Sequence, residues 1–596
     1  MENLDIARTL DETADLLEIQ GANPFRIRAY RNAVRTIEGL TQSLQSMVED
    51  DDLTELPGIG KELDQHVREL LQTGQLSTLN EVAREIPRTL VELTRLDGVG
   101  PKKARKLFDE LGVESVEGLE ALLDAGQVET LSGFGAKSAA KIKRSIEDHR
   151  KHTGRTLRAE AEPYIDSLIA HLSKAPGVGT IEVAGSYRRR KETIGDVDLL
   201  ATCDGDSQAV VDHFCAFDGA VRVEAAGSTK GNIILRSGLS VDLRVIPAEA
   251  FGAALLYFTG SKEHNVALRT MAVKRGFRVN EWGVFRTAPN QNEDSVYAED
   301  FDRDTAERVA GETEADCYAA LGLPWIAPEL REDRGEMAAA QQGRLPELIE
   351  RDAILGDLHM HSTWSDGTAS IEEMARACMD RGLTYMAITD HSRSLTMVNG
   401  LSPERVREQW LEVAQAQSAV GSGFTILRGQ EVDILKDGSL DQPDDVLAEL
   451  DVVVGSVHSF MDQDRDTMTA RVLCAVHSGF VDILGHPTGR LLGRREPYAI
   501  DMEAVLQACL EHDVAVEVNA HPRRLDLNDR HVARARELGV KIAINTDAHE
   551  TRGLDVLRFG LDQARRGWIE AKHVINCLEI AELRTWLLAR RPAAGA

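Results

Sequence analysis

The chain has 596 residues, of which 42% are hydrophobic and 28% charged, and its formal net charge is -29. We expect several domains, because a single hydrophobic core stops growing at roughly 250–300 residues. No apolar run approaches the roughly 18 residues of a membrane span, and the N-terminus lacks the features of a secretory signal, which predicts a cytoplasmic protein without membrane contact. The seven cysteines are scattered and form no C-x-x-C pair, which argues against a disulfide frame or a thiolate zinc site.

Residues 1–85 are predicted to form an N-terminal helical domain that binds DNA ends, and residues 86–157 a second helical subdomain. Three segments repeat one theme in this half: LPGIGKEL at 56, LDGVGPKKARKL at 96 and LSGFGAKSAAKI at 131. Two glycines flank an apolar residue and a helix start follows, which leaves backbone N–H groups free at the helix N-terminus to bind phosphate. One such turn is common, but three copies resemble the helix-hairpin-helix motif, which grips the DNA backbone. The expected contacts are Gly58, Gly60, Gly98, Gly100, Lys102, Gly133, Gly135 and Lys137.

Short β-type runs follow between residues 180 and 250, separated by turns that contain Gly and Asp. Asp196 and Asp198 stand two residues apart in one run, so both carboxylates leave a strand on the same face. Asp242 lies on another run that is able to pair alongside. A lone D-x-D is more often a strand end or a solvated face. Three converging carboxylates, however, require a cation, and their oxygens suit Mg²⁺ or Mn²⁺ in phosphoryl transfer.

The composition changes twice more along the chain. Helices are expected to return around residues 250–275, and residues 328–351, rich in Glu, Ala, Gln and Pro, are predicted to be a linker. Beyond it, β-type runs alternate with helical patterns, which predicts a parallel sheet or barrel. These runs cover residues 354–359, 385–391, 424–434, 451–459, 481–487, 514–520 and 541–549.

The order GSYRR, GDVD, VDLRVIP, YFTGS and GFRVNEWG between residues 185 and 283 resembles the family X DNA polymerases of the nucleotidyltransferase superfamily. The resemblance implies an α+β palm with an antiparallel or mixed sheet at 158–250 and a nucleotide-selecting subdomain at 251–327. It implies that Asp196, Asp198 and Asp242 bind Mg²⁺ or Mn²⁺ and that Asp242 accepts the proton of the primer 3′-hydroxyl. The positions that it marks for the nucleotide are Ser186, Arg189 and Gly195 at the phosphates, Tyr257 and Phe258 beside the sugar, Gly260, and Asn265 and Arg269 at the minor-groove side of the base pair.

The N-terminal domain departs from this family at one position. Members with deoxyribose-phosphate lyase activity carry a lysine on the helix after LPGIG, which forms a Schiff base with the abasic sugar. Here His66 occupies that position, and Glu62 stands where a second basic residue is usual. Because an imidazole cannot form this imine, we predict binding of DNA ends without strong lyase activity.

The stretch GDLHMHSTWSDG at 356 places two histidines on one face of a strand end, with an aspartate near them. A single histidine is more often a core or surface residue than a ligand, but here potential ligands recur at the ends of successive strands, the face where barrel active sites assemble. The pattern resembles the PHP (polymerase and histidinol phosphatase) domain. That implies a C-terminal α/β distorted barrel at 352–590, up to three Mn²⁺ or Zn²⁺ ions, and phosphodiester hydrolysis. The nine expected ligands are His359, His361, Asp366, His391, Glu431, His458, His486, Asp547 and His549.

Together these motifs predict a family X DNA polymerase that fills short gaps in DNA repair, joined to a Mn²⁺-dependent 3′-5′ exonuclease. The expected partners are deoxynucleoside triphosphates and gapped or nicked DNA with a 5′-phosphate end, and we expect a monomer. Two alternatives stay open: an end-processing hydrolase, acting as abasic endonuclease or 3′-phosphatase, with a weak polymerase half, and a non-enzymatic scaffold for DNA ends. The complete carboxylate and histidine sets argue against the scaffold.

Overall fold

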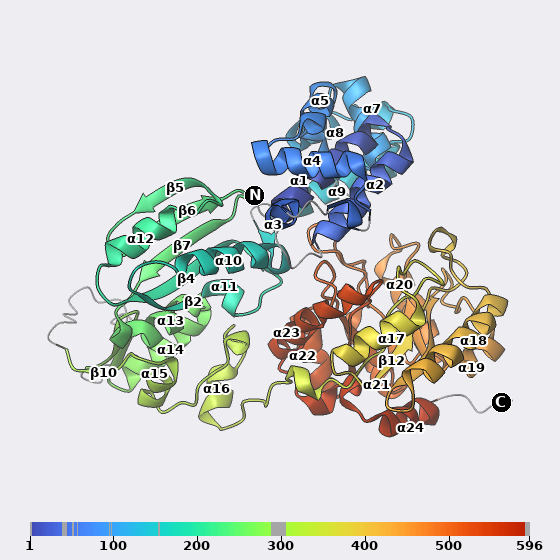
Figure 1. The fold of residues 1–596 in the computed structure, drawn as a ribbon. Coiled ribbons are helices and arrows are strands. Elements are labelled where there is room, and N and C mark those ends of the chain that lie inside the picture. Colours follow the sequence, from blue (N-terminus) through green and yellow to red (C-terminus); the bar gives the residue numbers. More distant parts are fainter. Residues whose placement is uncertain are drawn as a thin grey trace.

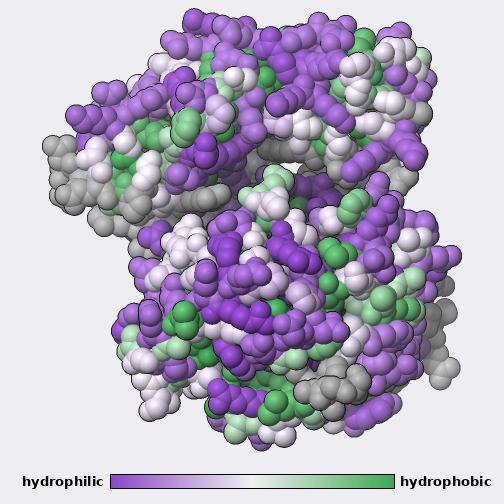
Figure 2. All heavy atoms as spheres, turned by 90° about the vertical axis from the view of Figure 1, so that its right-hand side faces the viewer, coloured by the Kyte–Doolittle hydropathy of each residue, from purple (hydrophilic) through white to green (hydrophobic). Residues whose placement is uncertain are grey.

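Figure 1 shows the protein as a computed structural model, which describes residues 3–38, 44–49, 53–56, 58–94, 96, 98–152, 155–287 and 306–590. The blue helices of the N-terminal part lie at the top, the teal and green sheet of the middle part at the left, and the yellow to red C-terminal part at the lower right. The face seen in Figure 2 is mostly hydrophilic, with hydrophobic side chains scattered among polar ones. Within the described ranges, no helix combines the length and the apolar character that a membrane span requires.

The N-terminal part, up to residue 152, is helical, as predicted, and its two predicted parts share one hydrophobic core that runs from Ile6 to Ile146. The core forms because the helices carry apolar residues on one face, for example Leu63, Val67 and Leu70 at helical spacing. Its helices are α1 (Asn3–Gln20), α2 (Pro24–Glu38), α3 (Leu44–Glu49), α4 (Lys61–Thr73), α5 (Ser77–Glu85), α6 (Leu90–Thr94), α7 (Pro101–Leu111), α8 (Val116–Asp124) and α9 (Ala136–His152).

Three of these helices begin directly after the repeated glycine turns. The first glycine of each turn has a positive φ, which favours glycine because it has no β-carbon: Gly58 at +79°, Gly98 at +92° and Gly133 at +91°. The second glycine immediately precedes α4, α7 or α9. A β-carbon on any of these second glycines would meet nothing within 4 Å, so the helix N-termini stay open to a ligand.

The middle part contains a mixed sheet, as expected. Its order is β2-β4-β7-β6-β5; β4 and β7 pair in parallel and the other pairs are antiparallel. Helices α10 (Arg158–Leu172) and α12 (Ser207–Cys215) contribute to the same hydrophobic core as the sheet. The strands are β2 (Val178–Val183), β4 (Asp196–Cys203), β5 (Ala220–Ala226), β6 (Lys230–Leu235) and β7 (Ser240–Val245), and the short pair β1 (Thr156–Leu157) and β3 (Thr193–Ile194) lies beside them.

Residues 251–287 and 306–350 form a further folded unit. It consists of α13 (Phe251–Thr259), α14 (Lys262–Lys274), β8 (Phe277–Asn280), β9 (Gly283–Arg286), β10 (Arg308–Ala310), α15 (Glu314–Ala320) and α16 (Glu336–Gln341). The segment 328–351, expected to be a linker, contains α16 and packs Leu330 and Ala340 into the core of this unit. Arg331 and Glu336 are fully buried there, because each has an oppositely charged or polar partner within the unit. The limits of the other domains stay a prediction.

The C-terminal part is an α/β unit with a parallel sheet. All seven β-type runs expected from the sequence are strands, in the order β11-β12-β13-β14-β15-β16-β17, and every neighbouring pair is parallel. A parallel bridge between Met360 and Ala548, just beyond β11 and β17, brings the outer strands together, so the sheet is a nearly closed barrel. Its strands are β11 (Gly356–Asp357), β12 (Tyr385–Ile388), β13 (Thr425–Asp433), β14 (Val452–Ser456), β15 (Ile483–Leu484), β16 (Ala515–Asn519) and β17 (Ile542–Asn545).

Helices cover the outside of this barrel (Figure 1). They are α17 (Ile371–Asp380), α18 (Pro403–Val420), α19 (Asp444–Glu449), α20 (Arg465–His477), α21 (Met502–Glu511), α22 (Asp529–Leu538), α23 (Leu557–Arg566) and α24 (Ile580–Arg590). Because the strands are parallel, their C-terminal ends meet on one face, where the polar residues that follow each strand converge.

Candidate active sites

The first candidate site lies on the mixed sheet. Asp196 and Asp198 stand on β4, and Asp242 on β7 is directly opposite Asp198 in the parallel pair. Burial, together with the charges of Asp196 and Asp242, raises the pKa of Asp198 to about 6. Gly185 has a φ of +63°, and a β-carbon there would lie 2.7 Å from a carboxylate oxygen of Asp198. Three carboxylates gathered in this way repel one another unless a cation joins them, and their oxygens fit Mg²⁺ or Mn²⁺.

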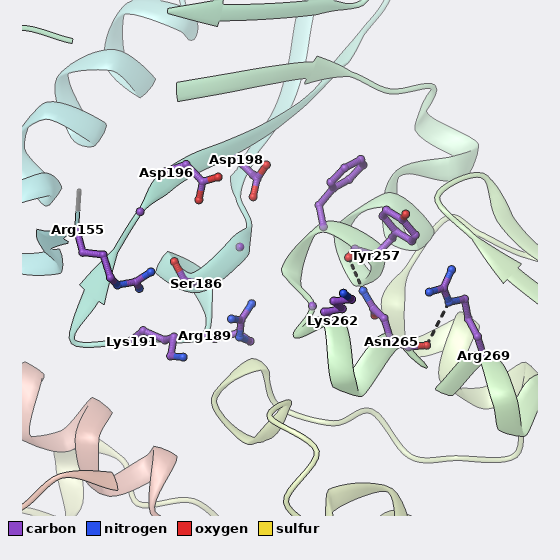
Figure 3. Close-up of a pocket in the computed structure, with 14 residues that line it drawn as sticks. Arg155, Ser186, Arg189, Lys191, Asp196, Asp198, Tyr257, Lys262, Asn265 and Arg269 are labelled. Carbon is purple, nitrogen blue, oxygen red and sulfur yellow. Dashed lines mark hydrogen bonds between the residues drawn. The ribbon is translucent and has the colours of Figure 1, made fainter. Parts of the chain in front are cut away.

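A pocket of about 430 Å³ opens beside two of these carboxylates (Figure 3). Every position expected to bind the nucleotide lines it: Ser186, Arg189, Gly195, Tyr257, Phe258, Gly260, Asn265 and Arg269. Arg155, Lys191 and Lys262 line it as well and were not among the expected nucleotide contacts. Lys191 lies two residues after GSYRR and Lys262 directly follows YFTGS, so their charge and position were available signals. The pocket therefore joins acidic residues on one wall to cationic residues on the others, which is the arrangement that a metal-bound triphosphate requires.

The side chains around this pocket are held by hydrogen bonds. Asn265 donates from Nδ2 to the carbonyl of Tyr257 at 2.7 Å, and Arg269 donates from Nε to the carbonyl of Asn265 at 3.3 Å (Figure 3). The rings of Tyr257 and Phe258 stand at 77° to each other, with their centroids 5.1 Å apart. Arg189 donates to the carbonyl of Thr259, which ties the loop after β2 to the end of α13. The pocket wall is thus built from two units of the chain.

The second candidate site lies at the C-terminal ends of the barrel strands. Eight of the nine expected ligands fall into three groups whose atoms lie within 4.8 Å of one another: His361, Asp366, His391 and His549; His359, His361 and Asp547; and His391, Glu431 and His458. The ninth, His486, has its Nε2 atom 3.1 Å from Oε1 of Glu431. The barrel thus brings the whole predicted set together.

Unpaired polar atoms show that this cluster fits cations. Both carboxylate oxygens of Glu431, Nε2 of His359 and Nδ1 of His361 are buried and make no hydrogen bond to the described residues. Nδ1 of His391 lies only 2.8 Å from Glu431, yet outside hydrogen-bonding geometry. Leaving such groups buried and unpaired is costly. Mixed imidazole and carboxylate ligands suit Mn²⁺, Zn²⁺ or Fe²⁺ better than Mg²⁺.

The protonation of the cluster also fits metal binding. Burial, followed by the neighbouring His549 and His391, lowers the pKa of His361 to about 3, so this imidazole is neutral and able to ligate. Burial acts in the same direction on His391, but Glu431 and Asp366 outweigh it and raise the pKa of His391 to about 10. A cation that enters this group must therefore displace a proton.

Buried acidic and amide residues orient these ligands. These orienting residues were not predicted from the sequence. Glu517 accepts a hydrogen bond from Nδ1 of His359 at 2.7 Å, and Asp433 accepts one from Nδ1 of His458 at 2.7 Å. Asn519 donates to Oδ2 of Asp547 at 3.0 Å. Such partners fix the tautomer and the direction of ligating imidazoles. The signal was present in the run VAVEVNA, where two polar residues alternate with apolar ones on a strand that is otherwise buried.

The helix-hairpin-helix turns keep the features that phosphate binding needs. Lys102 and Lys137 are exposed in the first turns of α7 and α9. Lys103 instead turns inward: it donates to the carbonyl of Gly98 at 2.9 Å and to the hydroxyl of Ser138 at 3.2 Å, which joins the second and third hairpins. The DNA contacts themselves remain a prediction.

His66 is held in a structural role on α4. Nδ1 of His66 lies 3.1 Å from the Tyr30 hydroxyl, and Nε2 lies 3.2 Å from the Thr78 hydroxyl. Both ring nitrogens thus have partners, and burial lowers the pKa of this imidazole. The absence of strong lyase activity stays a prediction, which borohydride trapping on preincised abasic DNA would test.

Comparisons with known proteins cover nearly all of the chain. The matching families are a helix-hairpin-helix domain at 1–76, a SAM-like helix-hairpin-helix tandem at 90–148, a DNA polymerase beta palm at 155–233, a DNA polymerase beta thumb at 254–332 and a PHP domain at 357–521. The DNA polymerase/3′-5′ exonuclease PolX of Bacillus subtilis (strain 168) is 40% identical over 589 residues, which is 98% of this chain and 99% of that protein.

Two other relatives each match one half. A probable phosphatase of Thermoanaerobacter sp. (strain X514) is 30% identical over 253 residues, 40% of this chain and 96% of that protein. DNA polymerase lambda of Rattus norvegicus is 26% identical over 356 residues, 55% of this chain and 56% of that protein. The near full-length match and the order of the domains lead to one conclusion: the chain belongs to the family X DNA polymerases that carry a C-terminal PHP domain.

Proposed function

We propose that this member of the family is a DNA-directed DNA polymerase that fills short gaps during DNA repair and trims 3′ ends through its PHP centre. The observation that carries the proposal is the pocket that combines Asp196 and Asp198 with Arg189 and the base-side residues Asn265 and Arg269. The printed name of the Bacillus subtilis relative, DNA polymerase/3′-5′ exonuclease PolX, supports both activities.

At the polymerase site, Asp196, Asp198 and Asp242 would hold Mg²⁺ or Mn²⁺. When bound, these ions neutralise charge on the phosphates and assist in-line displacement. Asp242, which lies opposite Asp198 in the parallel strand pair, accepts the proton of the primer 3′-hydroxyl, the role that the resemblance to family X polymerases implies for it. The Arg189 guanidinium and the Ser186 hydroxyl hold the outer phosphates of the incoming nucleotide.

The remaining pocket residues select the nucleotide. Tyr257 and Phe258 fill the space beside the sugar, so an additional 2′-hydroxyl is excluded by contact with a ring. Asn265 and Arg269 lie on one face of α14, four residues apart, and reach the minor-groove side of the new base pair. Gly195 and Gly260 leave room for the cationic side chains of the pocket, since a β-carbon on Gly195 would lie 3.5 Å from Arg155 and one on Gly260 would lie 3.1 Å from Arg189.

At the PHP site, the nine ligands would hold up to three Mn²⁺ or Zn²⁺ ions. When bound, these ions activate water for attack on the terminal phosphodiester and neutralise the leaving oxygen. The chain supplies the neutral imidazole of His361 and the orienting carboxylates Glu517 and Asp433, which keep the ligands ready before the DNA arrives. Gapped or nicked DNA is bound through the three helix-hairpin-helix turns, and the enzyme acts as a cytoplasmic monomer.

The test uses a labelled primer on DNA with a one-nucleotide gap and a 5′-phosphate downstream, incubated with Mn²⁺ with and without the complementary nucleotide. We expect the primer to lengthen by one with the nucleotide and to shorten without it. Shortening alone would favour the second candidate, an end-processing hydrolase with a weak polymerase half. The similarity of the PHP part to a probable phosphatase supports that candidate. Lengthening alone would assign the PHP cluster to another substrate or to a structural role.

A further inference from the structure

The loop that is expected to bind the nucleotide phosphates rests on the PHP domain. This loop, residues 185–192, lies between β2 and β4 and includes the short helix α11 (Gly185–Arg188). Its neighbour in the PHP domain is α23, whose last residue, Arg566, donates a hydrogen bond to the backbone carbonyl of Arg189. Pale red ribbon of the C-terminal part lies at the lower left of Figure 3. Glu192 at the end of the loop accepts hydrogen bonds from Arg490 and from Nε2 of Gln563, the latter at 2.7 Å. The polymerase pocket is therefore in direct contact with the domain that carries the second active site.

Glu332 is the centre of this contact. Its side chain is only 11% exposed, and Oε1 accepts hydrogen bonds from Nε of Arg189 at 3.1 Å and from Nη1 of Arg566 at 3.0 Å. Nζ of Lys191 lies 3.9 Å from its other oxygen. Arg189 and Lys191 both line the nucleotide pocket. One carboxylate is thus shared between two cations of the polymerase pocket and one cation of the PHP domain.

The PHP side of this contact is firmly anchored. Arg566 is the last residue of α23 and is 2% exposed. Besides Glu332, it donates to the backbone carbonyl of Arg189 at 2.7 Å and to Oδ2 of Asp529 at 2.7 Å. The same oxygen of Asp529 also accepts a hydrogen bond from Nη1 of Arg334 at 3.0 Å. Arg566 therefore keeps a carboxylate partner of its own, whichever residue Glu332 is paired with.

We propose that in the nucleotide-free enzyme the Glu332 carboxylate pairs with Arg189 and Lys191, the cations that bind the nucleotide phosphates. When a nucleotide binds, Arg566 of the PHP domain becomes the cationic partner of Glu332. This inference rests on the proposed triphosphate role of Arg189. A phosphate would compete with Glu332 for the positive charge of Arg189, whose Nε donates to Glu332 and whose Nη1 donates to the carbonyl of Thr259. When the phosphates draw Arg189 and Lys191 away, a buried carboxylate without a cation would be left, which is costly. Arg566 removes that cost by pairing with Glu332. Glu332 and Arg566 thus position the cations of the pocket without touching the substrate.

The proposal predicts opposite effects for the two partners. Arg566→Ala leaves Glu332 dependent on Arg189 and Lys191, and should raise the KM for the incoming nucleotide by about tenfold, with kcat changed by less than about twofold. Glu332→Gln removes the competing charge and should lower this KM by about twofold. The double variant should return to within about threefold of Glu332→Gln, because the cost in Arg566→Ala exists only while Glu332 is charged. Arg566→Lys retains the charge and should give an intermediate KM.

The measurement is steady-state insertion of one nucleotide into a one-nucleotide gap, in a His361→Ala parent so that primer degradation does not distort the rates. Arg565→Ala is the matched control: Arg565 lies on the same helix and also crosses to the polymerase half, pairing with Glu329 at 2.8 Å, but it does not contact the loop. Its KM should match the parent. If Arg566→Ala and Glu332→Gln both raise KM, and the double variant is as poor as Arg566→Ala or worse, the contact serves docking alone and the proposal is overturned.

A second readout separates this inference from the polymerase assignment. Equilibrium binding of the same nucleotide is measured on a dideoxy-terminated primer, where no insertion occurs. A parent that binds the nucleotide but never extends a normal primer would contradict the proposed function. The order of nucleotide affinities across the four variants would still support or overturn the proposed change of partner of Glu332 from Arg189 and Lys191 to Arg566.

Discussion

The palm and the PHP domain hold their acidic ligands in different ways. In the palm, Asp196 is exposed and Asp198 faces an open pocket with no neutralising partner among the described hydrogen bonds. In the PHP domain, His359 and Glu431 are buried, and Glu517 fixes the imidazole of His359. The palm site is thus incomplete until ion and nucleotide arrive together, whereas the PHP site has its ligands oriented beforehand. We infer that substrate binding organises the first site and that the protein interior organises the second.

The largest expected effect separates the two centres. Asp198→Ala should reduce primer extension at least about a thousandfold while degradation continues, and His361→Ala should do the reverse, because each residue belongs to one centre only. Both reactions are followed on the same labelled primer. Loss of both activities from either change, in a protein whose thermal unfolding is unaltered, would contradict the model of two independent sites.

A smaller effect tests the prepared state of the PHP centre. Glu517→Gln should lower the rate of 3′ degradation about 10- to 100-fold, since a partner that orients a ligand contributes about that much to metal affinity or activity. Additional Mn²⁺ should restore part of the rate, and primer extension should not change. Glu503→Gln, on the surface of the same domain and paired with Arg534, is the control. Equal losses in both variants would show that Glu517 has no special role.

The smallest expected effect tests whether the ionised carboxylate of Asp198 destabilises the palm when no metal ion is bound. In chelator, Asp198→Asn should be more stable than the parent at pH 7 by about 1–2 kcal/mol, since one pKa unit corresponds to about 1.4 kcal/mol and the side chain remains partly accessible. The folded pKa of about 6 lies above the usual value of 3.8. The ionised carboxylate therefore costs stability above pH 6, and protonation removes this cost as the pH falls towards 4.

Thermal unfolding between pH 4 and 8 measures this difference. We expect the advantage of Asp198→Asn to disappear near pH 4. We also expect Mn²⁺ to reverse the order at pH 7, because the ion binds the parent carboxylates more strongly than the amide. Equal stability of the parent and Asp198→Asn at pH 7 would mean that neither burial nor the neighbouring carboxylates disfavour the ionised form of Asp198.

The PHP ligands were predictable because each one lies near the C-terminal end of a strand or in the segment that follows it. The runs around His391, His458 and His486 are apolar and bounded by turns, so their strands could be assigned from the sequence. Parallel pairing then forces the ends of these strands onto one face. The same reasoning brought Asp198 and Asp242 side by side. The sequence pattern thus identified the functional residues that lie on or next to regular strands.

Contacts between charged residues far apart in the chain were not predictable. Glu329, Arg331 and Glu336 belong to a polar segment that resembles a linker in composition, yet they are buried because Arg565, Glu314 and His264 pair with them. Those partners lie up to 236 positions away. Hydrophobic periodicity carries no information on such pairs, since a charged residue on a helix is usually solvated.

The buried Arg331 also bears on how the two enzymes of this chain can be separated. Arg331 and Arg188 together neutralise Glu314, and α16 covers His264 through Glu336. A polymerase fragment that stopped before residue 328 would lose half of that charge compensation and expose its own interior. A fragment that includes α16 would keep its core but expose Glu192, Glu329 and Glu332, whose arginine partners lie in the PHP domain. Dividing the chain in the segment 328–351 would therefore alter the structure or the exposed surface of the polymerase fragment that remains.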